Sequence, residues 1–415
     1  MGRKKNILKM FIFSIIFSSR AEQNEQQTAQ PEVWITVIVH GTIGLRPYLA
    51  PRTIIKLFKD DIACSAYEKG VWYIRHNPFF YKNQPITAPG LVPLSITTPI
   101  KENGAQLYAS LFDSLFDTPN NDTRFYYAFG WSGLVSCKKR LEAARTLFKE
   151  LNIVLRAFKE QHINPHIRLI GYSHGGNVLL NLAQVQPNKD EEQLSIDELI
   201  CIGMPVQKET DFLINSPLFK KIYHFYSRED HIQKLDCFST KRFFSCRRFK
   251  NNKRFMVPEN LVQAEIKIKV HSQKYRRKHC IDRSPGHVEL WCFGWPTARM
   301  GYRSYFPLYP LPVAVFIREL VNMIDKSETK EKHLVIELFP EDACAYIRKR
   351  YDAVRTEVPF ITQEKLNNMC QEAVASKPDF YTMKTYMEQV HNAINMAQPR
   401  KKKYTSRRKK CMCGS

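Results

Sequence analysis

One serine stands in a pattern that could make it a nucleophile. Residues 167–180 begin as an apolar run, pass through glycines on both sides of Ser173, and continue with residues typical of a helix. Gly171 and Gly175 lie two positions before and after this serine, where a sharp turn from strand to helix has room only for small residues. Such a turn holds the hydroxyl at a helix N-terminus, where backbone N–H groups stabilise developing negative charge. The pattern predicts a nucleophile elbow, with an ordinary glycine-rich loop as the alternative.

A serine hydroxyl becomes an effective nucleophile when an imidazole accepts its proton and a carboxylate orients that imidazole. Asp230 follows directly after the apolar run 222–226, and Glu229 and Asp236 are alternatives for the carboxylate. His287 lies in a glycine-bearing loop after the apolar alternation of residues 264–270. The chain order serine, acid, histidine favours Asp230 and His287 as the partners of Ser173.

Two other histidines, His271 and His279, compete with His287 for the role of base. Together with Cys280 and Cys292, these three histidines could also form a zinc site. The spacing of these residues matches no standard zinc pattern, so the sequence favours a loop histidine that acts as a base.

The first strand-like segment ends in a His-Gly pair. Residues 33–39 form a continuous apolar run of the kind found in buried parallel sheets, and His40, Gly41 and Thr42 follow it. In serine hydrolases a turn of this kind lets the next backbone N–H face the nucleophile. We expect the N–H groups of Thr42 and His174 to form an oxyanion hole, whereas an ordinary strand-ending turn is the alternative.

The elements that must position these residues alternate along the chain. Apolar runs at 124–129, 167–172, 198–202 and 222–226 predict further buried strands, and leucines recur at helical spacing between residues 136 and 161. A second apolar helical segment covers residues 310–324. Strands that alternate with helices predict an α/β fold with a doubly wound, mostly parallel sheet, whose active residues lie at the carboxyl ends of the strands.

With these residues in this order, the chain resembles the α/β-hydrolase superfamily, in particular its lipase and esterase-like members. The resemblance covers residues 33–325, and the turn Gly130-Trp131-Ser132-Gly133 adds to it. It implies hydrolysis of carboxylic esters, lipids among them, with Ser173 as nucleophile, Asp230 as orienting acid and His287 as base. It also implies an oxyanion hole formed by Thr42 and His174, and no metal or organic cofactor. The family's first two strands have no counterpart before residue 33.

Two alternative functions stay open at this stage. A phospholipase or a thioesterase of the same fold would differ only in its substrate pocket. A non-catalytic lipid-binding or surface-interaction protein could use the same scaffold, because a fold does not guarantee an activity.

The sequence divides into four segments. Residues 1–21 have the basic, apolar and small-residue regions of a signal peptide, which predicts export, with an uncleaved membrane anchor as the alternative. Residues 22–326 form the predicted hydrolase domain, in which residues 45–123 are a candidate lid or insert and residues 235–262 a basic insertion. Residues 327–398 are predicted as a helical extension, and residues 399–415 as a basic, disordered tail.

Charge and cysteine content narrow the choice of partners. The chain holds 63 Lys and Arg against 40 Asp and Glu, a formal charge of +23, which favours anionic partners such as an acidic membrane surface. Nucleic acid is less favoured as a partner because no recognised nucleic-acid-binding module accompanies the positive charge. Eleven cysteines suit an exported protein, with Cys237 and Cys246, and Cys280 and Cys292, as locally spaced pairs that could form disulfides or remain thiols.

Overall fold

The computed structural model is an α/β protein built around one mostly parallel sheet. The structure describes residues 32–43, 55–57, 59–76, 84–97, 103–116, 122–186, 193–235, 245–253, 255–271, 280–294, 308–327, 332–376, 388 and 392. Its eleven strands follow the order β11-β10-β9-β7-β6-β5-β4-β1-β3-β2, and β8 pairs with β7 outside this path. They are β1 (Val33–Val39), β2 (Gly90–Leu94), β3 (Thr123–Gly130), β4 (His166–Tyr172), β5 (Ile196–Ile202), β6 (Phe219–Tyr226), β7 (Leu261–His271), β8 (Cys280–Arg283), β9 (His333–Phe339), β10 (Cys344–Lys349) and β11 (Arg355–Pro359).

Seven neighbouring strands, from β3 through β1 to β7 and β9, pair in parallel. The antiparallel strands lie outside this centre: β2 pairs with β3 at one edge, β10 and β11 form the other edge, and β8 pairs with the end of β7. This arrangement confirms the predicted α/β class with a mostly parallel sheet. Parallel strands bring their carboxyl ends to one edge, so residues that follow β1, β4 and β6 meet there.

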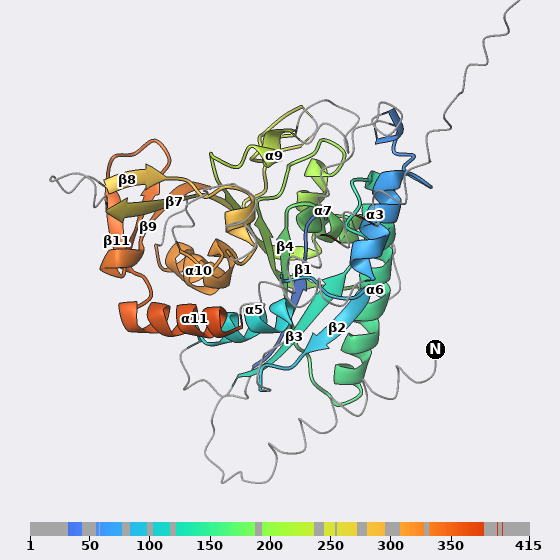
Figure 1. Cartoon of the computed structure of the whole chain (residues 1–415), viewed down its shortest axis with the longest axis horizontal. Helices are drawn as coiled ribbons and strands as arrows, with labels where there is room; N and C mark the ends of the chain where they lie inside the picture. Colours follow the sequence, from blue (N-terminus) through green and yellow to red (C-terminus); the bar gives the residue numbers. More distant parts are fainter. Residues whose placement is uncertain are drawn as a thin grey trace, which may run out of the picture.

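Helices cover both faces of the sheet (Figure 1). Helices α6, α7 and α8 pack on one face through buried residues such as Leu147 and Leu179, and α5, α10 and α11 pack on the other. The helices and 3-10 turns are α3 (Ala66–Arg75), α5 (Gly104–Asp113), α6 (Cys137–Lys159), α7 (His174–Leu180), α8 (Leu182–Val185), η1 (Asp211–Asn215), α9 (Ile232–Leu235), η2 (Val288–Leu290), η4 (Val313–Phe316), α10 (Ile317–Lys326), η5 (Pro340–Asp342) and α11 (Gln363–Ala375).

Helix α6 begins where its sequence predicts. The side chain of Ser136 accepts a hydrogen bond from the backbone N–H of Lys139, which satisfies one of the unpaired donors of the first turn. The predicted leucine stripe faces the sheet, and Leu147 and Leu151 are fully buried. The apolar segment 310–324 likewise forms η4 and α10, which pack in the core.

The prediction of a helical extension at residues 327–398 is wrong for its first half. Residues 333–359 form β9, β10 and β11, and β9 continues the main sheet by pairing in parallel with β7. Leu334, Ile336 and Leu338 face the core that α10 and α11 cover. Helix α11 fits the helical prediction, as do the described residues 388 and 392, which are helical. The pairing of β9 with a strand about 70 residues earlier is a tertiary effect that local periodicity does not report.

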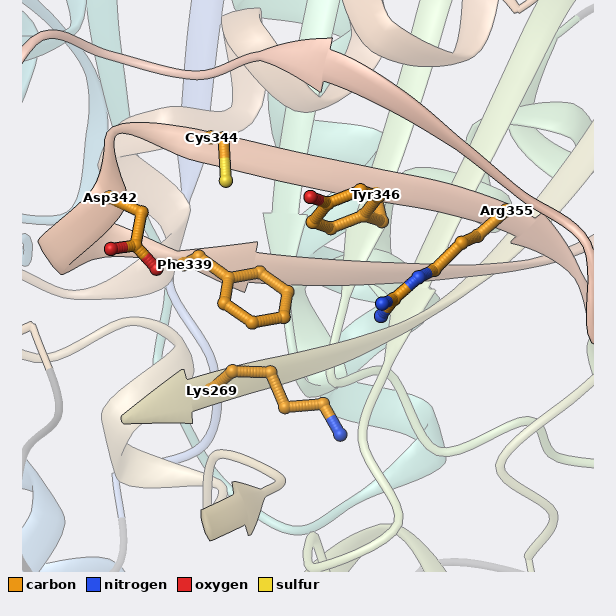
Figure 2. Close-up of a pocket in the computed structure, with 6 residues that line it drawn as sticks. All are labelled: Lys269, Phe339, Asp342, Cys344, Tyr346 and Arg355. Atoms are coloured by element: carbon orange, nitrogen blue, oxygen red, sulfur yellow. The ribbon is translucent and has the colours of Figure 1, made fainter. Parts of the chain in front are cut away.

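The opposite face of this strand extension, called the open face below, is exposed and polar at its outer strand β11, while Val335 and Glu337 of β9 are buried on it. Figure 2 shows a shallow pocket there, in which the rings of Phe339 and Tyr346 lie on neighbouring strands and the nitrogen ends of Lys269 and Arg355 lie on the same side of them. The Arg355 guanidinium lies 4.4 Å from the centroid of the Tyr346 ring. On the same side of the sheet, helices α6 and α7 cover the central strands.

The segment 45–123, predicted as a lid or insert, contains part of the core. Strand β2 extends the sheet edge beside β3, and α5 buries Leu107, Tyr108 and Phe112 against η4 and the sheet. The Tyr108 hydroxyl donates to the carbonyl of Ala314 at 2.6 Å. Strand β2 therefore supplies an edge that the sequence alone did not reveal. Residues 77–83 of this segment lie outside the described residues.

The described part of the basic insertion 235–262 returns along the sheet from β6 to β7. Phe249 is buried in the core, and its backbone N–H and carbonyl both bond to the side chain of Gln263 in β7. Lys250 and Lys253 are exposed. Instead of forming only a cationic rim, this segment serves as the crossover that parallel strands require.

Several predictions about the chain ends fall on residues that the structure does not describe. Residues 1–31, which include the predicted signal peptide, and the basic tail 399–415 are among them. Within the described ranges, no helix has the length and apolar character needed to cross a membrane.

Candidate active site

Ser173 occupies a strained turn between β4 and α7. Its backbone has φ 50° and ψ −129°, a region that non-glycine residues rarely adopt and that costs roughly 1–3 kcal/mol. Gly175 permits the turn, because a Cβ at this position would lie 2.4 Å from the carbonyl oxygen of Val39 in β1. The turn places the serine at the carboxyl edge of the sheet, and helix α7 begins directly after it, as the elbow pattern predicts.

The three residues predicted as partners lie in line at this edge. His287 Nε2 is 3.0 Å from Ser173 Oγ, and His287 Nδ1 is 2.7 Å from Asp230 Oδ2. Ser173 follows β4, Asp230 follows β6, and His287 lies in the loop between β8 and η2. Asp230 is fully buried and Ser173 is 4% exposed. At these distances the imidazole can accept the proton of the serine hydroxyl while the carboxylate orients it.

Asp230 is held by bonds beyond the one to His287. Its Oδ1 accepts a hydrogen bond from the backbone N–H of Gln233 at 3.1 Å. The Gln233 side chain donates to the carbonyl of Met204 at 2.9 Å, and Arg247 Nε donates to the carbonyl of Asp230 at 2.9 Å. These bonds fix the carboxylate so that one oxygen faces His287. Gln233 was not predicted from the sequence, although its place three residues after the acid fits a turn bond of this kind.

The loop that carries His287 is held by the residue before the nucleophile. The Tyr172 hydroxyl donates to the carbonyl of His287 at 2.9 Å, and the two rings lie 4.9 Å apart. The Tyr172 ring also stacks on that of Trp291, with an interplanar angle of 2°. Burial raises the pKa of Tyr172, so its hydroxyl stays a donor. Sequence reasoning missed this role, because Tyr172 and His287 are 115 residues apart.

The turn after β1 packs directly on the serine. A Cβ on Gly41 would lie 2.7 Å from the Cβ of Ser173 and 2.9 Å from the ring of Tyr172, so the backbone approaches to a distance that only glycine allows. Thr42 follows in this turn, and His174 is the first residue of α7. Of the two residues predicted to supply oxyanion donors, Thr42 therefore follows a glycine that packs on Ser173, and His174 follows Ser173 in the chain.

The competing residues lie elsewhere or outside the described ranges. Glu229 and His231 are both more than half exposed and pair with each other at 3.7 Å. Asp236, His279 and the side chain of His271 are outside what the structure describes. In the described ranges, no group of three or more His, Cys, Asp or Glu is arranged to hold a metal ion. Cys246 and Cys292, each part of a candidate disulfide pair, are free thiols.

Comparison with known proteins adds no family to this geometry. No protein-family model matches the chain, and no curated protein matches it either.

Proposed function

We propose that this protein is a serine hydrolase of carboxylic esters that acts through an acyl-enzyme on Ser173. The observation that carries the proposal is the line of two short contacts from Ser173 Oγ through His287 to Asp230. In the first step His287 Nε2 takes the hydroxyl proton while Oγ attacks the ester carbonyl, and Asp230 stabilises the imidazolium that forms. His287 then protonates the leaving alcohol, and in the second step it activates the water that releases the acid.

We assign the scaffold to the α/β-hydrolase fold. Its support is the strained serine between a parallel strand and a helix, and the chain order serine, acid, histidine along the carboxyl edge of the sheet. The antiparallel strand β2 beside β3 also supports the assignment, because it supplies an edge to the sheet where the sequence alone left the family's early strands without a counterpart.

The N–H groups of Thr42 and His174 are the proposed oxyanion donors. The tetrahedral intermediate places a negative charge on the former carbonyl oxygen, and two fixed donors stabilise that charge more than the neutral ester. The contact of Gly41 with Ser173, and the start of α7 at His174, support this role. The proposed reaction requires no metal or organic cofactor.

Apolar residues beside the triad favour lipid esters as substrates. Val288 follows His287 and is 38% exposed, and Ile232, two residues after Asp230, is 52% exposed. Exposed apolar side chains next to a catalytic group suit an acyl chain or a lipid surface, and the formal charge of +23 suits an acidic one. Phospholipase and thioesterase activities share this chemistry. A purely binding protein would have no use for a serine activated in this way.

The test is hydrolysis of a series of p-nitrophenyl esters, from acetate to palmitate, by the wild-type protein and by Ser173→Ala. We expect the variant to lose turnover on the order of 10⁴–10⁶-fold, since the nucleophile is gone. Its Tm should stay within about 2 °C of the wild type, because only one oxygen is removed. Equal hydrolysis by both proteins would refute the proposal.

A further inference from the structure

Two turns beside Ser173 are bonded to each other. The backbone N–H of Trp131, in the turn after β3, points to Nε2 of His40 at 3.2 Å, and the Trp131 indole N–H donates to the carbonyl of His40 at 2.7 Å. The two rings are stacked with centroids 5.7 Å apart. A further bond joins the backbone N–H of Ile43 to the carbonyl of Gly133 at 2.9 Å. The turn after β3 therefore fixes both the His40 ring and the backbone of the turn after β1.

These contacts determine which nitrogen of His40 carries its proton. A backbone N–H can only donate, so Nε2 must present its lone pair to Trp131. Nδ1 then carries the hydrogen and donates to the carbonyl of Gly41 at 2.7 Å. Burial, and secondarily the positive charge of Arg75, hold the pKa of His40 well below its usual range, so the ring stays neutral.

The bond to Gly41 fixes a peptide group that matters for the proposed reaction. The carbonyl of Gly41 and the N–H of Thr42 belong to one planar trans peptide, in which they point in opposite directions. Holding the oxygen on the imidazole therefore sets the direction of the N–H. A bond to the carbonyl also polarises the peptide and strengthens the N–H as a donor.

We propose that His40, held in its neutral Nδ1–H tautomer by Trp131, is a positioning residue that aims the Thr42 N–H at the oxyanion formed on Ser173. This role rests on the proposed ester hydrolysis. It gives a function to the imidazole of the His-Gly pair and to the turn at residues 130–133, neither of which takes part in the triad.

Two substitutions separate this role from simple packing. His40→Asn places an amide N–H close to the position of Nδ1, and His40→Gln places its amide close to Nε2 and leaves the Gly41 carbonyl without its donor. We expect His40→Gln to lower kcat on the order of 10–100-fold with little change in KM, because the lost interaction acts in the transition state. His40→Asn should recover most of the lost kcat. Equal losses in both variants would overturn the proposal.

A matched control uses the same type of bond elsewhere. His76, at the end of α3, also places Nδ1 at 2.7 Å from a backbone carbonyl, that of Trp72. His76→Gln and His76→Asn should leave kcat unchanged. If they lower kcat as His40→Gln does, the effect is one of general stability and the proposed role of His40 is wrong.

A transition-state analogue provides a readout that packing alone would not move. A trifluoromethyl ketone forms a tetrahedral adduct with the activated serine, and its affinity should fall in His40→Gln by the same factor as kcat/KM. Unchanged affinity for the ketone would contradict the proposal.

The tautomer can be measured in the wild-type protein without any variant. Nitrogen-edited NMR of protein labelled with ¹⁵N-histidine should show Nδ1 of His40 protonated and Nε2 unprotonated, and the reverse pattern would overturn the proposal. An inert wild-type protein would refute the proposed ester hydrolysis itself. An active wild type whose His40→Gln variant keeps its kcat would refute only the role of His40.

Discussion

The carboxyl edge of the central strands and the open face of β9 to β11 differ in how far their polar side chains are buried. At the central edge, His40, Ser173 and Asp230 are almost completely buried, and each makes specific bonds to neighbouring turns. On the open face, Arg355 is about half exposed, and its contacts are a ring and a carboxylate at 3.8 Å (Figure 2). Both regions belong to one sheet. On the open face Glu337 is buried, but its partner Arg355 is not held by burial.

This difference indicates where substitutions will affect the chemistry. A buried polar group that loses its partner costs the full desolvation of the remaining group, whereas exposed pairs contribute little. Changes at the central edge should therefore alter turnover or stability strongly. Changes on the open face should have small effects on both.

The largest effect in this comparison is expected from Asp230→Asn. The amide would present either a donor or a neutral acceptor to His287 Nδ1, so the imidazole would lose its orientation and the stabilisation of its charge. We expect kcat for ester hydrolysis to fall about 10⁴-fold, with the fold retained by circular dichroism. A variant with near wild-type kcat would show that Asp230 does not assist His287.

A second effect should appear as a loss of stability in acid. His224 in β6 is buried, and burial lowers its pKa from 6.5 to about 4. The folded protein then keeps His224 neutral while the unfolded chain binds a proton, so stability present above pH 6.5 is lost as the pH falls toward 4. The contribution is on the order of 3 kcal/mol.

His224→Gln tests this contribution. The Gln amide can keep the bond that His224 Nε2 makes to the carbonyl of Arg247 at 2.8 Å, but it does not titrate. Urea unfolding between pH 8 and pH 4.5 should show a smaller loss of stability in the variant than in the wild type. The same loss in both proteins would show that His224 does not contribute to acid sensitivity.

A smaller effect is expected from Gly175→Ala. The new Cβ would lie 2.4 Å from the carbonyl oxygen of Val39, so β1 and the elbow must move apart. We expect a loss of about 1–3 kcal/mol in the free energy of unfolding. Gly286→Ala is the matched control for stability, since the nearest atom to its Cβ would be 3.6 Å away. Equal stability of the two variants would argue against a tight elbow.

The smallest effect is expected on the open face, from Arg355→Ala. Its guanidinium stacks on Tyr346 and lies 3.8 Å from Glu337, and the side chain is 51% exposed. Stability should change by less than about 1 kcal/mol, and ester hydrolysis should not change. A strong loss of activity would show that the open face and the candidate active site are coupled.

The sequence predicts more of the candidate site than of the edge strands of the sheet. The elbow at Ser173 and the acid and histidine that follow later strands are local patterns with chemical reasons, and the structure brings these residues together. The bonds of Tyr172 to His287 and of His40 to Trp131 join turns that are far apart in the chain. Local sequence patterns identify the site residues, but contacts between turns that are distant in the chain appear only in the folded structure.

The C-terminal strands could not be predicted for a related reason. Residues 334–338 form an almost continuous apolar run, which fits a buried strand or a helix, and the choice depends on pairing with β7. Strand β2 was also missed, because it is short and carries Pro93. Proline is tolerated there since β2 is an edge strand, which again depends on the assembled sheet.

If Ser173 is an activated nucleophile, it should react covalently with a fluorophosphonate probe. Intact mass should show one adduct on the wild-type protein, and peptide mapping should place it on Ser173. Ser173→Ala should remain unlabelled under the same conditions. Absence of labelling in folded wild-type protein, or equal labelling of the variant, would show that Ser173 is not an activated nucleophile.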